Sequence, residues 1–236
     1  MKLKNKIAII TGGGKGIGKE ICLGLAKEGA KIIIADLDKE NSSIVVETII
    51  QNGGDAIYVE TNVSSEQSVK NLITKSINKF NQIDILINNA GIRHVKKLED
   101  HNLNDWNDMI SVNLTGPYIC CQAVIPQMKK IGKGKIINFG SIASFMGRPD
   151  RVGYVAAKSG VLGLTRALAI DLKGTNINVN TICPGLISTP FNKKYAEDPT
   201  RGEKWGKETI VGRWGMPSDI VGAAVFLSSN ESDFIN

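Results

Sequence analysis

Tyr154 and Lys158 lie four residues apart in the segment YVAAK (154–158), whose sequence looks helical. This spacing places the two side chains on one face of a helix, one turn apart. A phenol ordinarily loses its proton only near pH ~10, and a nearby ammonium group favours the phenolate. The pair is therefore a candidate general base that works near neutral pH. A surface tyrosine beside a solvated lysine has the same spacing, so the choice depends on the elements that position the two residues.

Six short apolar segments, rich in isoleucine and valine, alternate with amphipathic segments along the chain. The predicted strands are 7–10, 32–35, 56–59, 83–87, 135–139 and 177–182. The predicted helices lie near 17–28, 39–51, 65–80, 104–130 and 154–173. Strands that are covered on both faces are apolar throughout, and regular strand–helix alternation is typical of a parallel sheet. The sequence thus predicts a single-domain α/β protein, residues 1–236, with a Rossmann-type doubly wound parallel sheet and helices on both faces.

The first predicted strand runs into the glycine-rich segment TGGGKGIG (11–18). Glycines at such a turn let the backbone approach a phosphate, which the unpaired N–H groups of the following helix then bind. The fixed positions are Gly12, Gly16 and Gly18, whose spacing differs from strict GxGxxG. A glycine run alone is weak evidence, but between a buried strand and a helix it predicts a nucleotide site.

The second predicted strand ends at Asp36. An acidic residue about 20 positions after the glycines accepts hydrogen bonds from a ribose diol and repels a 2′-phosphate. Asp36 therefore favours NAD over NADP, and Asp38 adds to the negative field. Lys15, a cation near the phosphates, favours NADP instead. Because Asp36 lies where the ribose is expected, we predict NAD, with NADP as the less favoured cofactor.

The composition, 42% hydrophobic and 22% charged residues in a chain of 236, is ordinary for a globular protein. No run of about 18 apolar residues occurs, so neither a membrane span nor a membrane partner is expected. The N-terminus, MKLKNKIAII, has too short an apolar run for a signal peptide and is predicted to be the first strand. The net charge of +6 includes lysines near 129–135 without interleaved aromatic residues, so no nucleic-acid partner is expected.

The cysteines and histidines indicate neither a disulfide framework nor a metal site. No CxxC pair is present among the four cysteines, Cys22, Cys120, Cys121 and Cys183. Free thiols in a reducing compartment fit better, and we expect a cytoplasmic location. The two histidines, His94 and His101, are too few and too scattered for a zinc site, so no metal is predicted.

Further motifs follow in order along the chain: NNAG (88–91), SVNLTG around Asn113, SIAS from Ser141, YVAAK, and Pro184-Gly185. Together with TGGGKGIG, they make the chain resemble the short-chain dehydrogenase/reductase family over essentially its whole length. GRWGMPSD (212–219), with SIASFMG and PGLIST, is similar to the gluconate 5-dehydrogenase and 2-deoxy-D-gluconate 3-dehydrogenase branch. The resemblance implies a Rossmann-type fold and hydride transfer with a nicotinamide.

The same resemblance implies a catalytic set: Asn113, Ser141, Tyr154 and Lys158. Tyr154 would be the base that takes the alcohol proton, with its pKa lowered by Lys158 and by the positive nicotinamide ring. Ser141 would hydrogen-bond the substrate oxygen, and Lys158 would also hold the nicotinamide ribose. Asn113 would hold a water that passes protons from Lys158 to bulk solvent. A turn serine or a helix-kink amide explains each residue alone, but not all four in register.

The implied cofactor contacts run along the whole chain. They are Gly12, Gly14, Lys15, Gly16, Ile17, Gly18, Asp36, Leu37, Asn62, Val63, Asn89, Ala90, Gly91, Tyr154, Lys158, Pro184, Gly185, Ile187 and Thr189. Asn88, Ala90 and Gly91 would line the adenosine and ribose side, while Ile187 and Thr189 would reach the carboxamide. Asn62 departs from the aspartate that the family usually has against the adenine, although an amide can still hydrogen-bond there.

Cations near the expected pocket suggest an acidic substrate. Arg93 and His94 follow NNAG, and Arg148 and Arg151 lie between Ser141 and Tyr154. The predicted substrate contacts are Arg93, His94, Ser141, Arg148 and Tyr154. An arginine can clamp a carboxylate with two hydrogen bonds, with Arg93 first and Arg148 second in our expectation. The segment 190–216, rich in proline, glycine, tryptophan and charge, is expected to be a lid over the substrate.

Three functions stay open from the sequence. The first is an NAD-dependent dehydrogenase that acts on a small molecule, a sugar acid or polyol. The second is an NADPH-dependent 3-oxoacyl-(acyl carrier protein) reductase, which Lys15 and the basic surface favour and Asp36 disfavours. The third is a non-catalytic nucleotide-binding protein, which has no need of all four catalytic residues. The resemblance also implies a homotetramer and, after SDFIN, a further family strand that is absent from this chain; its loss would expose a sheet edge.

Overall fold

Six parallel strands form one sheet in the computed structural model, which describes residues 1–236. The strands are β1 (Ile7–Thr11), β2 (Lys31–Asp36), β3 (Ala56–Glu60), β4 (Ile85–Asn88), β5 (Gly134–Phe139) and β6 (Ile177–Ile182). Their spatial order is β3-β2-β1-β4-β5-β6. All six strands predicted from the sequence are confirmed, and the order reverses between β1 and β4, where such sheets bind ligands.

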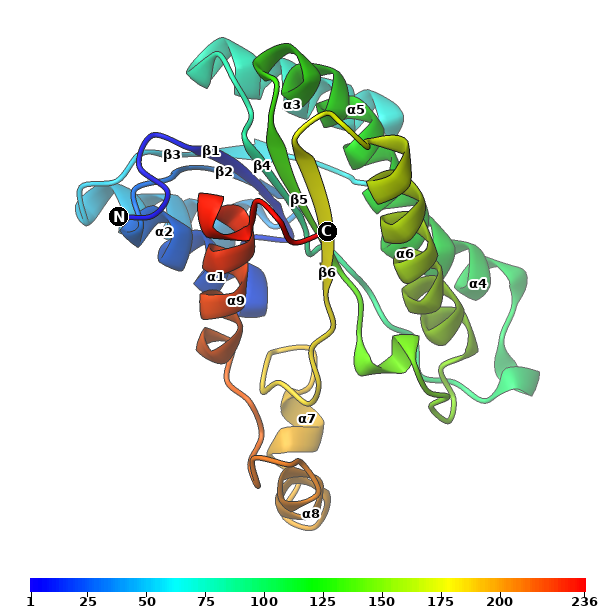
Figure 1. Ribbon diagram of the computed structural model, residues 1–236. Coiled ribbons are helices and arrows are strands. Elements are labelled where there is room, and N and C mark those ends of the chain that lie inside the picture. The colour runs from blue at the N-terminus through cyan, green and yellow to red at the C-terminus, as the bar shows by residue number, and fades with distance from the viewer.

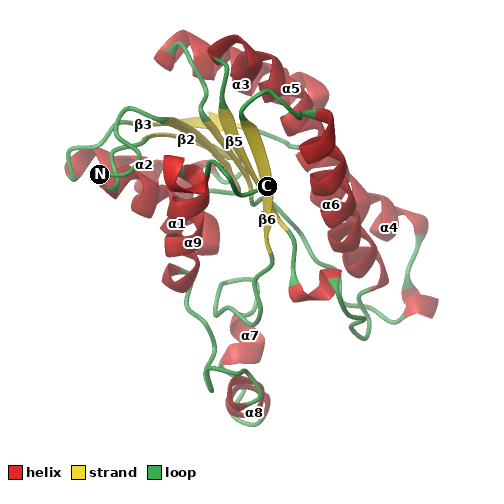
Figure 2. Ribbon diagram, in the orientation of Figure 1, coloured by secondary structure: helices red, strands yellow, loops and turns green.

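Nine α-helices accompany the sheet. They are α1 (Gly16–Lys27), α2 (Lys39–Gln51), α3 (Glu66–Phe80), α4 (Leu103–Ile110), α5 (Gly116–Ile131), α6 (Val152–Asp171), α7 (Lys193–Ala196), α8 (Arg201–Lys207) and α9 (Ser218–Ser228). Helices α1, α2 and α9 cover one face of the sheet, and α3, α5 and α6 cover the other (Figures 1 and 2). The doubly wound α/β prediction is therefore confirmed.

The strand side chains enter two separate cores, one on each face. Ile9 and Ile33 belong to a cluster of 20 buried residues under α3 and α5, whereas Ile10 and Ile34 belong to a cluster of 17 under α1 and α2. Burial of each such side chain stabilises the folded state by about 1.5–3 kcal/mol. Because successive strand residues point to opposite faces and both are covered, the strands are apolar throughout rather than alternating.

The predicted helix 104–130 is not one regular α-helix. Helix α4 ends at Ile110, one π-helical turn spans Ser111–Thr115, and α5 then begins. Pro117, near the start of α5, has no N–H and cannot donate to the Asn113 carbonyl as a regular α-helix requires. The wide turn therefore lies at Asn113, one of the predicted catalytic residues.

The predicted lid region leaves the sheet at the carboxyl edge of β6. Helices α7 and α8 lie on this excursion and project away from the body of the molecule (Figure 1). Its two ends are tied together at the base, where the Ser188 N–H donates to the Gly215 carbonyl at 2.8 Å and the Gly215 N–H donates to Leu186 at 2.9 Å. The segment is thus a closed loop over the edge where the strands end.

Helix α9 was not predicted from the sequence. Its segment, SDIVGAAVFLS, is apolar at most positions and lacks a clear 3.6-residue alternation. It packs on α1, where a β-carbon at Gly24 would collide with the Val221 side chain. None of the helices is both long enough and apolar enough to cross a membrane.

Candidate active site

The turn between β1 and α1 forms a cradle at the point where the strand order reverses. Gly12 and Gly16 have positive φ angles of 65° and 55°, which side-chain-bearing residues rarely adopt. A β-carbon at Gly18 would collide with the Gly12 carbonyl, so only glycine allows α1 to pack there. No side chain caps the first turn of α1, and the N–H groups of that turn, which includes Ile17, remain available to an anion.

Asn89 fastens this cradle to the end of β4. Its side-chain amide donates to the Thr11 carbonyl at 3.0 Å and to the Gly12 carbonyl at 2.9 Å. The Thr11 hydroxyl in turn accepts the N–H groups of Asn89 and Ala90 at 3.0 Å each. The side-chain amide of Asn89 therefore holds the turn, a positioning role that the sequence did not predict.

Asp36 faces the glycine turn. One carboxylate oxygen accepts the Gly14 N–H at 2.9 Å, and the other accepts the Asp38 N–H at 3.0 Å. A β-carbon at Gly14 would lie 3.1 Å from the Asp36 carboxylate, so glycine keeps this space open. The exposed Leu37 follows directly. A carboxylate at this place fits a ribose diol, and the donors of α1 fit a pyrophosphate, so the residues fit a nicotinamide dinucleotide.

Lys15 and Asp38, which were expected to act on the cofactor in opposite directions, are paired with each other. The Lys15 ammonium lies 2.6 Å from the Asp38 carboxylate, which also caps α2 by accepting the Asn41 N–H. The hydrogen bonds from Lys15 and Asn41 lower the pKa of Asp38 to about 2. The two charges compensate, which leaves Asp36 as the carboxylate that faces the turn.

The remaining predicted cofactor residues border the same edge of the sheet. Asn62 is exposed, and its side-chain oxygen accepts the Ser64 N–H at 3.0 Å. The Val63 side chain is buried in the core against Gly116. Thr189 lies over the start of α1, where a β-carbon at Gly16 would approach it to 3.5 Å.

The chain after β6 supports the turn that holds Ser141. The Pro184 carbonyl accepts the Ile142 N–H at 3.1 Å. Gly185 follows, and Ile187 is buried, with its carbonyl accepting the side-chain amide of Asn192 at 3.0 Å. This stretch therefore links the turn at Ser141 to the base of the predicted lid.

The fully buried Asn113 ties the π-helical turn to the loop after β4. Its amide nitrogen donates to the carbonyls of Ile92 and Met109 at 3.0 Å, and its oxygen accepts the Ile92 N–H at 3.2 Å. A β-carbon at Gly91 would lie 2.8 Å from this oxygen and 3.8 Å from the Lys158 nitrogen. Both amide hydrogens of the Asn113 side chain are thus engaged, so a water held by Asn113 would donate to one of its oxygens.

Ser141, Tyr154 and Lys158 converge as the sequence predicted. The Ser141 hydroxyl oxygen accepts the Ala143 N–H at 3.1 Å, which leaves its own proton free for donation. Ser144, which the sequence did not single out, accepts the Ser141 N–H at 3.1 Å and donates to the Lys158 carbonyl at 2.7 Å. Ser144 therefore fixes the distance between the turn at Ser141 and α6.

Burial raises the pKa of Tyr154, while Ser141, Arg93 and Arg151 act in the opposite direction. This net direction differs from the lowered pKa expected from the spacing to Lys158. The Lys158 ammonium lies 6.0 Å from the centre of the Tyr154 ring and donates to the Phe139 carbonyl at 2.7 Å. Burial lowers the pKa of Lys158 to about 8, because no carboxylate compensates its charge.

Arg93 lies between the catalytic residues and the lid. It donates to the Asn192 side chain at 3.0 Å and to the Phe191 carbonyl at 3.1 Å, and its guanidinium stacks on the Phe191 ring at 4.5 Å. Burial and the nearby Arg151 lower the pKa of Arg93. The second arginine whose charge reaches Tyr154 is therefore Arg151, whereas the sequence favoured Arg148.

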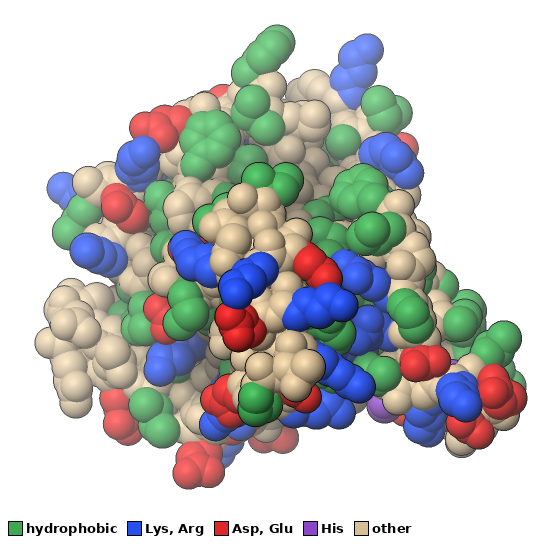
Figure 3. All heavy atoms as spheres, turned by 90° about the horizontal axis from the view of Figure 1, so that it is seen from below, with side chains coloured by type: hydrophobic (Ala, Val, Ile, Leu, Met, Phe, Trp, Pro, Cys, Tyr) green, Lys and Arg blue, Asp and Glu red, His purple; other side chains and the backbone are tan.

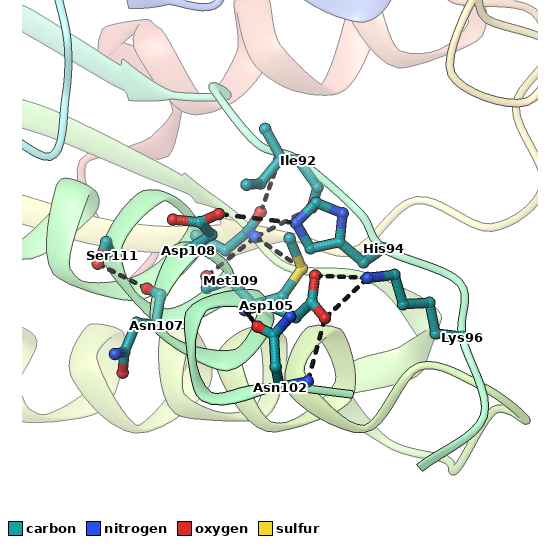
Figure 4. Close-up of polar contacts among 10 residues, drawn as sticks. Ile92, His94, Lys96, Asn102, Asp105, Asn107, Asp108, Met109 and Ser111 are labelled. Atoms are coloured by element: carbon teal, nitrogen blue, oxygen red, sulfur yellow. Dashed lines mark hydrogen bonds and ion pairs between the residues drawn. The ribbon is translucent and has the colours of Figure 1, made fainter. Parts of the chain in front are cut away.

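A cavity of about 330 Å³ opens beside Arg93, between the loop after β4 and α7. Its lining residues are Arg93, His94, Val95, Lys96, Phe191, Lys194 and Tyr195. Helix α4 orients Lys96, whose ammonium lies 2.8 Å from Asp105, and places Asp108 4.0 Å from the His94 Nε2 (Figure 4). Sequence analysis placed Arg93 and His94 here but missed Phe191, Lys194 and Tyr195, which only the course of the lid brings back.

Comparison with known proteins gives consistent matches. The family model for short chain dehydrogenase matches residues 6–200. The 5-keto-D-gluconate 5-reductase of Escherichia coli strain K12 is 38% identical over 234 residues, which cover 99% of this chain and 92% of the relative. The 3-oxoacyl-[acyl-carrier-protein] reductase of Thermotoga maritima is 36% identical over 236 residues, which cover 100% of this chain and 95% of the relative.

Solved structures agree. A provisionally assigned gluconate dehydrogenase from Agrobacterium tumefaciens superposes with a TM-score of 0.96 at 33% identity, over 100% of this chain and 93% of that one. A provisionally assigned NAD(P)-dependent gluconate 5-dehydrogenase from Beutenbergia cavernae, with NADP bound at low occupancy, gives 0.94 at 31% identity, over 100% and 94%. With the glycine turn and the Ser141–Tyr154–Lys158 cluster in place, the chain belongs to the short-chain dehydrogenase/reductase family, whose members are oxidoreductases acting on CH–OH groups.

Proposed function

We propose that the chain transfers a hydride between NAD and the secondary alcohol or ketone of a sugar acid or polyol. The observation that carries the proposal is the pair of arginines beside Tyr154. Arg93 bonds only neutral groups, and the Nε of Arg151 is buried without a hydrogen-bond partner. Both arginines are half-buried, where a counter-charge stabilises a cation more than it does in bulk water. A substrate carboxylate, gripped by two hydrogen bonds, would supply it.

The chain's own residues would perform the proton chemistry. The Ser141 hydroxyl donates a hydrogen bond to the substrate oxygen, and the Tyr154 hydroxyl exchanges a proton with that oxygen. Lys158 favours the phenolate of Tyr154 and can bind a ribose hydroxyl. When bound, the nicotinamide gives or takes the hydride. The lid, held by Arg93, would exclude water from the cavity beside these residues.

Asp36 supports NAD as the cofactor. Its carboxylate faces the Gly14 N–H, and Lys15 is neutralised by Asp38 rather than free for a 2′-phosphate. We therefore expect wild-type kcat/KM to be at least about tenfold higher with NAD than with NADP, a difference of roughly 1.4 kcal/mol. Asp36→Ala should reduce this ratio, because it relieves repulsion of the phosphate. A wild-type preference for NADP would contradict the role given to Asp36.

A second candidate is the reduction of a 3-oxoacyl group on an acyl carrier protein. Figure 3 looks onto α7 and α8 and shows Lys and Arg side chains gathered around that end of the molecule, with carboxylates between them. Such a surface suits an acidic carrier protein, and the T. maritima reductase named above is nearly as similar as the E. coli one. The same site chemistry serves both substrates.

Activity measurements separate the two candidates. Absorbance of the reduced nicotinamide should report oxidation of a sugar acid such as gluconate with NAD or NADP, and little reduction of a 3-oxoacyl thioester with NADH or NADPH. Tyr154→Phe should lower kcat by ~10²–10⁴-fold and leave cofactor affinity nearly unchanged, because only the proton donor is lost. Faster turnover of the thioester would favour the second candidate. More than about a tenth of wild-type kcat in the Tyr154→Phe variant would remove this residue from the mechanism.

A further inference from the structure

A second polar cavity lies at the edge of the sheet opposite Tyr154, where β1, β4, β5 and β6 begin. Its volume is about 280 Å³, and Ile85 is its single hydrophobic lining residue. Lysine, aspartate, asparagine and serine side chains line the rest, from the starts of these strands and from the end of α9. The cavity shares no residue with the candidate active site.

The acidic side chains of the cavity are already engaged. One Asp84 oxygen accepts the Ile7 N–H and the Gln82 amide, each at 2.8 Å. Asp233 lies 2.7 Å from the Lys135 ammonium, which also donates to the Asn178 oxygen at 2.8 Å. Lys135 is therefore compensated, and little negative charge is left for the other two lysines that line the cavity.

Those two lysines, Lys6 and Lys133, differ in exposure: Lys6 is half-buried, whereas Lys133 is exposed. The Lys6 side chain is only 18% exposed, and its ammonium is 3.8 Å from the nearest Asp84 oxygen. Lys133 makes no ion pair with any carboxylate of the chain. Burial lowers the pKa of Lys6, and although Asp84 opposes this effect, the positive charge of Lys133 adds to it. The charge of Lys133 repels that of Lys6, and an anion bound between the two ammonium groups would relieve this repulsion.

Ser228 supplies an independent observation. Its side chain is 1% exposed and lines the same cavity, and its hydroxyl has no hydrogen-bond partner. A buried hydroxyl without a partner costs free energy, and such groups in proteins commonly meet a ligand or an ordered water. The Ser228 hydroxyl thus lacks a partner beside a cavity that Lys6 and Lys133 also line.

We propose that this cavity binds a small oxyanion, the phosphate or carboxylate group of a small molecule, between Lys6 and Lys133 with the Ser228 hydroxyl as a further donor. Lysine ammonium groups are common phosphate ligands, and a serine hydroxyl donates readily to an oxyanion. The site would be separate from the cofactor cradle, whose phosphate donors lie at the other edge of the sheet.

Titration calorimetry on the full chain tests the proposal. Saturating NAD or NADP first fills the cofactor cradle, and inorganic phosphate or acetate is then titrated at constant ionic strength. Wild-type protein should bind at least one of the two anions. Lys133→Gln should weaken that binding by about tenfold or more, the scale of a charged hydrogen bond, and Ser228→Ala should weaken it less.

Lys130→Gln is the matched control, since it removes the same charge from the exposed end of α5 outside the cavity. It should bind the anion as wild-type protein does. Wild-type protein that binds neither phosphate nor acetate would overturn the proposal. So would equal losses in the Lys133→Gln and Lys130→Gln variants, because the anion would then respond to net charge rather than to this cavity.

Discussion

Lys158 carries a buried charge that lowers the stability of the folded protein but would serve the proposed proton chemistry. The residue is 5% exposed, and its ammonium donates to the Phe139 carbonyl and lies near no carboxylate. Burial lowers its pKa to about 8, against 10.5 for an ordinary lysine. The difference corresponds to about 3 kcal/mol of cost for keeping the charge inside the folded protein at neutral pH. The cost is understandable if the charge acts on Tyr154 and on a bound nicotinamide ribose.

Replacing Lys158 by methionine should therefore stabilise the protein while abolishing turnover. Between pH 8 and 10.5 the unfolded chain binds more protons at this residue than the folded chain, so wild-type stability should rise with pH across this window. Lys158→Met should lose that rise and gain roughly 1–3 kcal/mol at pH 7, after the loss of the Phe139 hydrogen bond. Urea unfolding at several pH values measures both effects.

The control is Lys130→Met, which replaces an exposed lysine on α5 and should keep the wild-type pH dependence of stability. A Lys158→Met variant that is less stable than wild type at pH 7 would show that the charge is compensated in a way that the burial and contacts of Lys158 do not reveal.

The sequence predicted which catalytic residues meet but not the environment in which they meet. The four-residue spacing of Tyr154 and Lys158 defines a helix face, and the motif order brings Ser141 to the same strand edge. Burial, which decides the direction of the Tyr154 pKa, depends on residues distant in sequence. For the same reason the sequence favoured Arg148, whereas the structure brings Arg151 towards Tyr154. The path of a loop cannot be derived from residue types.

At the scale of elements, periodicity predicted the strands and the regular helices well. It could not reveal the π-helical turn at Asn113, because one wide turn barely changes the apolar pattern of 104–130. The absent N–H of Pro117 was the available signal. Helix α9 was missed because its residues are apolar at most positions, so nothing distinguished a helix face.

The lid is joined to the sheet edge mainly through Arg93. Its guanidinium bonds Asn192 and the Phe191 carbonyl and stacks on two aromatic rings, those of Phe191 and Tyr195. Hydrogen bonds from a charged group contribute about 1.5–3 kcal/mol, and stacking of a cation on an aromatic ring adds about 0.5–2 kcal/mol. Few other contacts hold α7 and α8 to the body, so this residue should control how often the segment opens.

Arg93→Ala should accelerate tryptic cleavage within 193–207, where five lysines and arginines lie, by about tenfold under native conditions. The reason is that cleavage follows the population of the open segment. Gel or mass analysis of digestion time courses measures it. Arg148→Ala, which removes an arginine that makes no hydrogen bond in the structure, should leave the cleavage rate unchanged. Equal acceleration in both variants would mean that Arg93 does not hold the lid.

At the scale of the whole molecule, the two edges of the sheet have different tasks. The carboxyl edge carries the glycine turn, the catalytic cluster and the lid, whereas the amino edge carries the second cavity. The side surfaces expose large apolar side chains, several of them on α4, α5 and α6. These include Trp106 (39% exposed), Tyr118 (48%), Val152 (43%) and Ile170 (75%).

These apolar surfaces argue that the chain associates with copies of itself. Exposed apolar side chains on adjacent helices favour an interface, because association removes them from water. The family resemblance favours a tetramer with two-fold axes. Light scattering at micromolar concentration should thus give about four times the chain mass of 25.5 kDa.

Tyr118→Lys combined with Ile170→Lys should lower this mass, because a lysine at each position would have to be buried without a partner charge. Ile44→Lys, at a 52% exposed position on α2, should leave the mass unchanged. A monomer mass for wild-type protein would refute the assembly and would imply that the outer faces of α4, α5 and α6 remain in water.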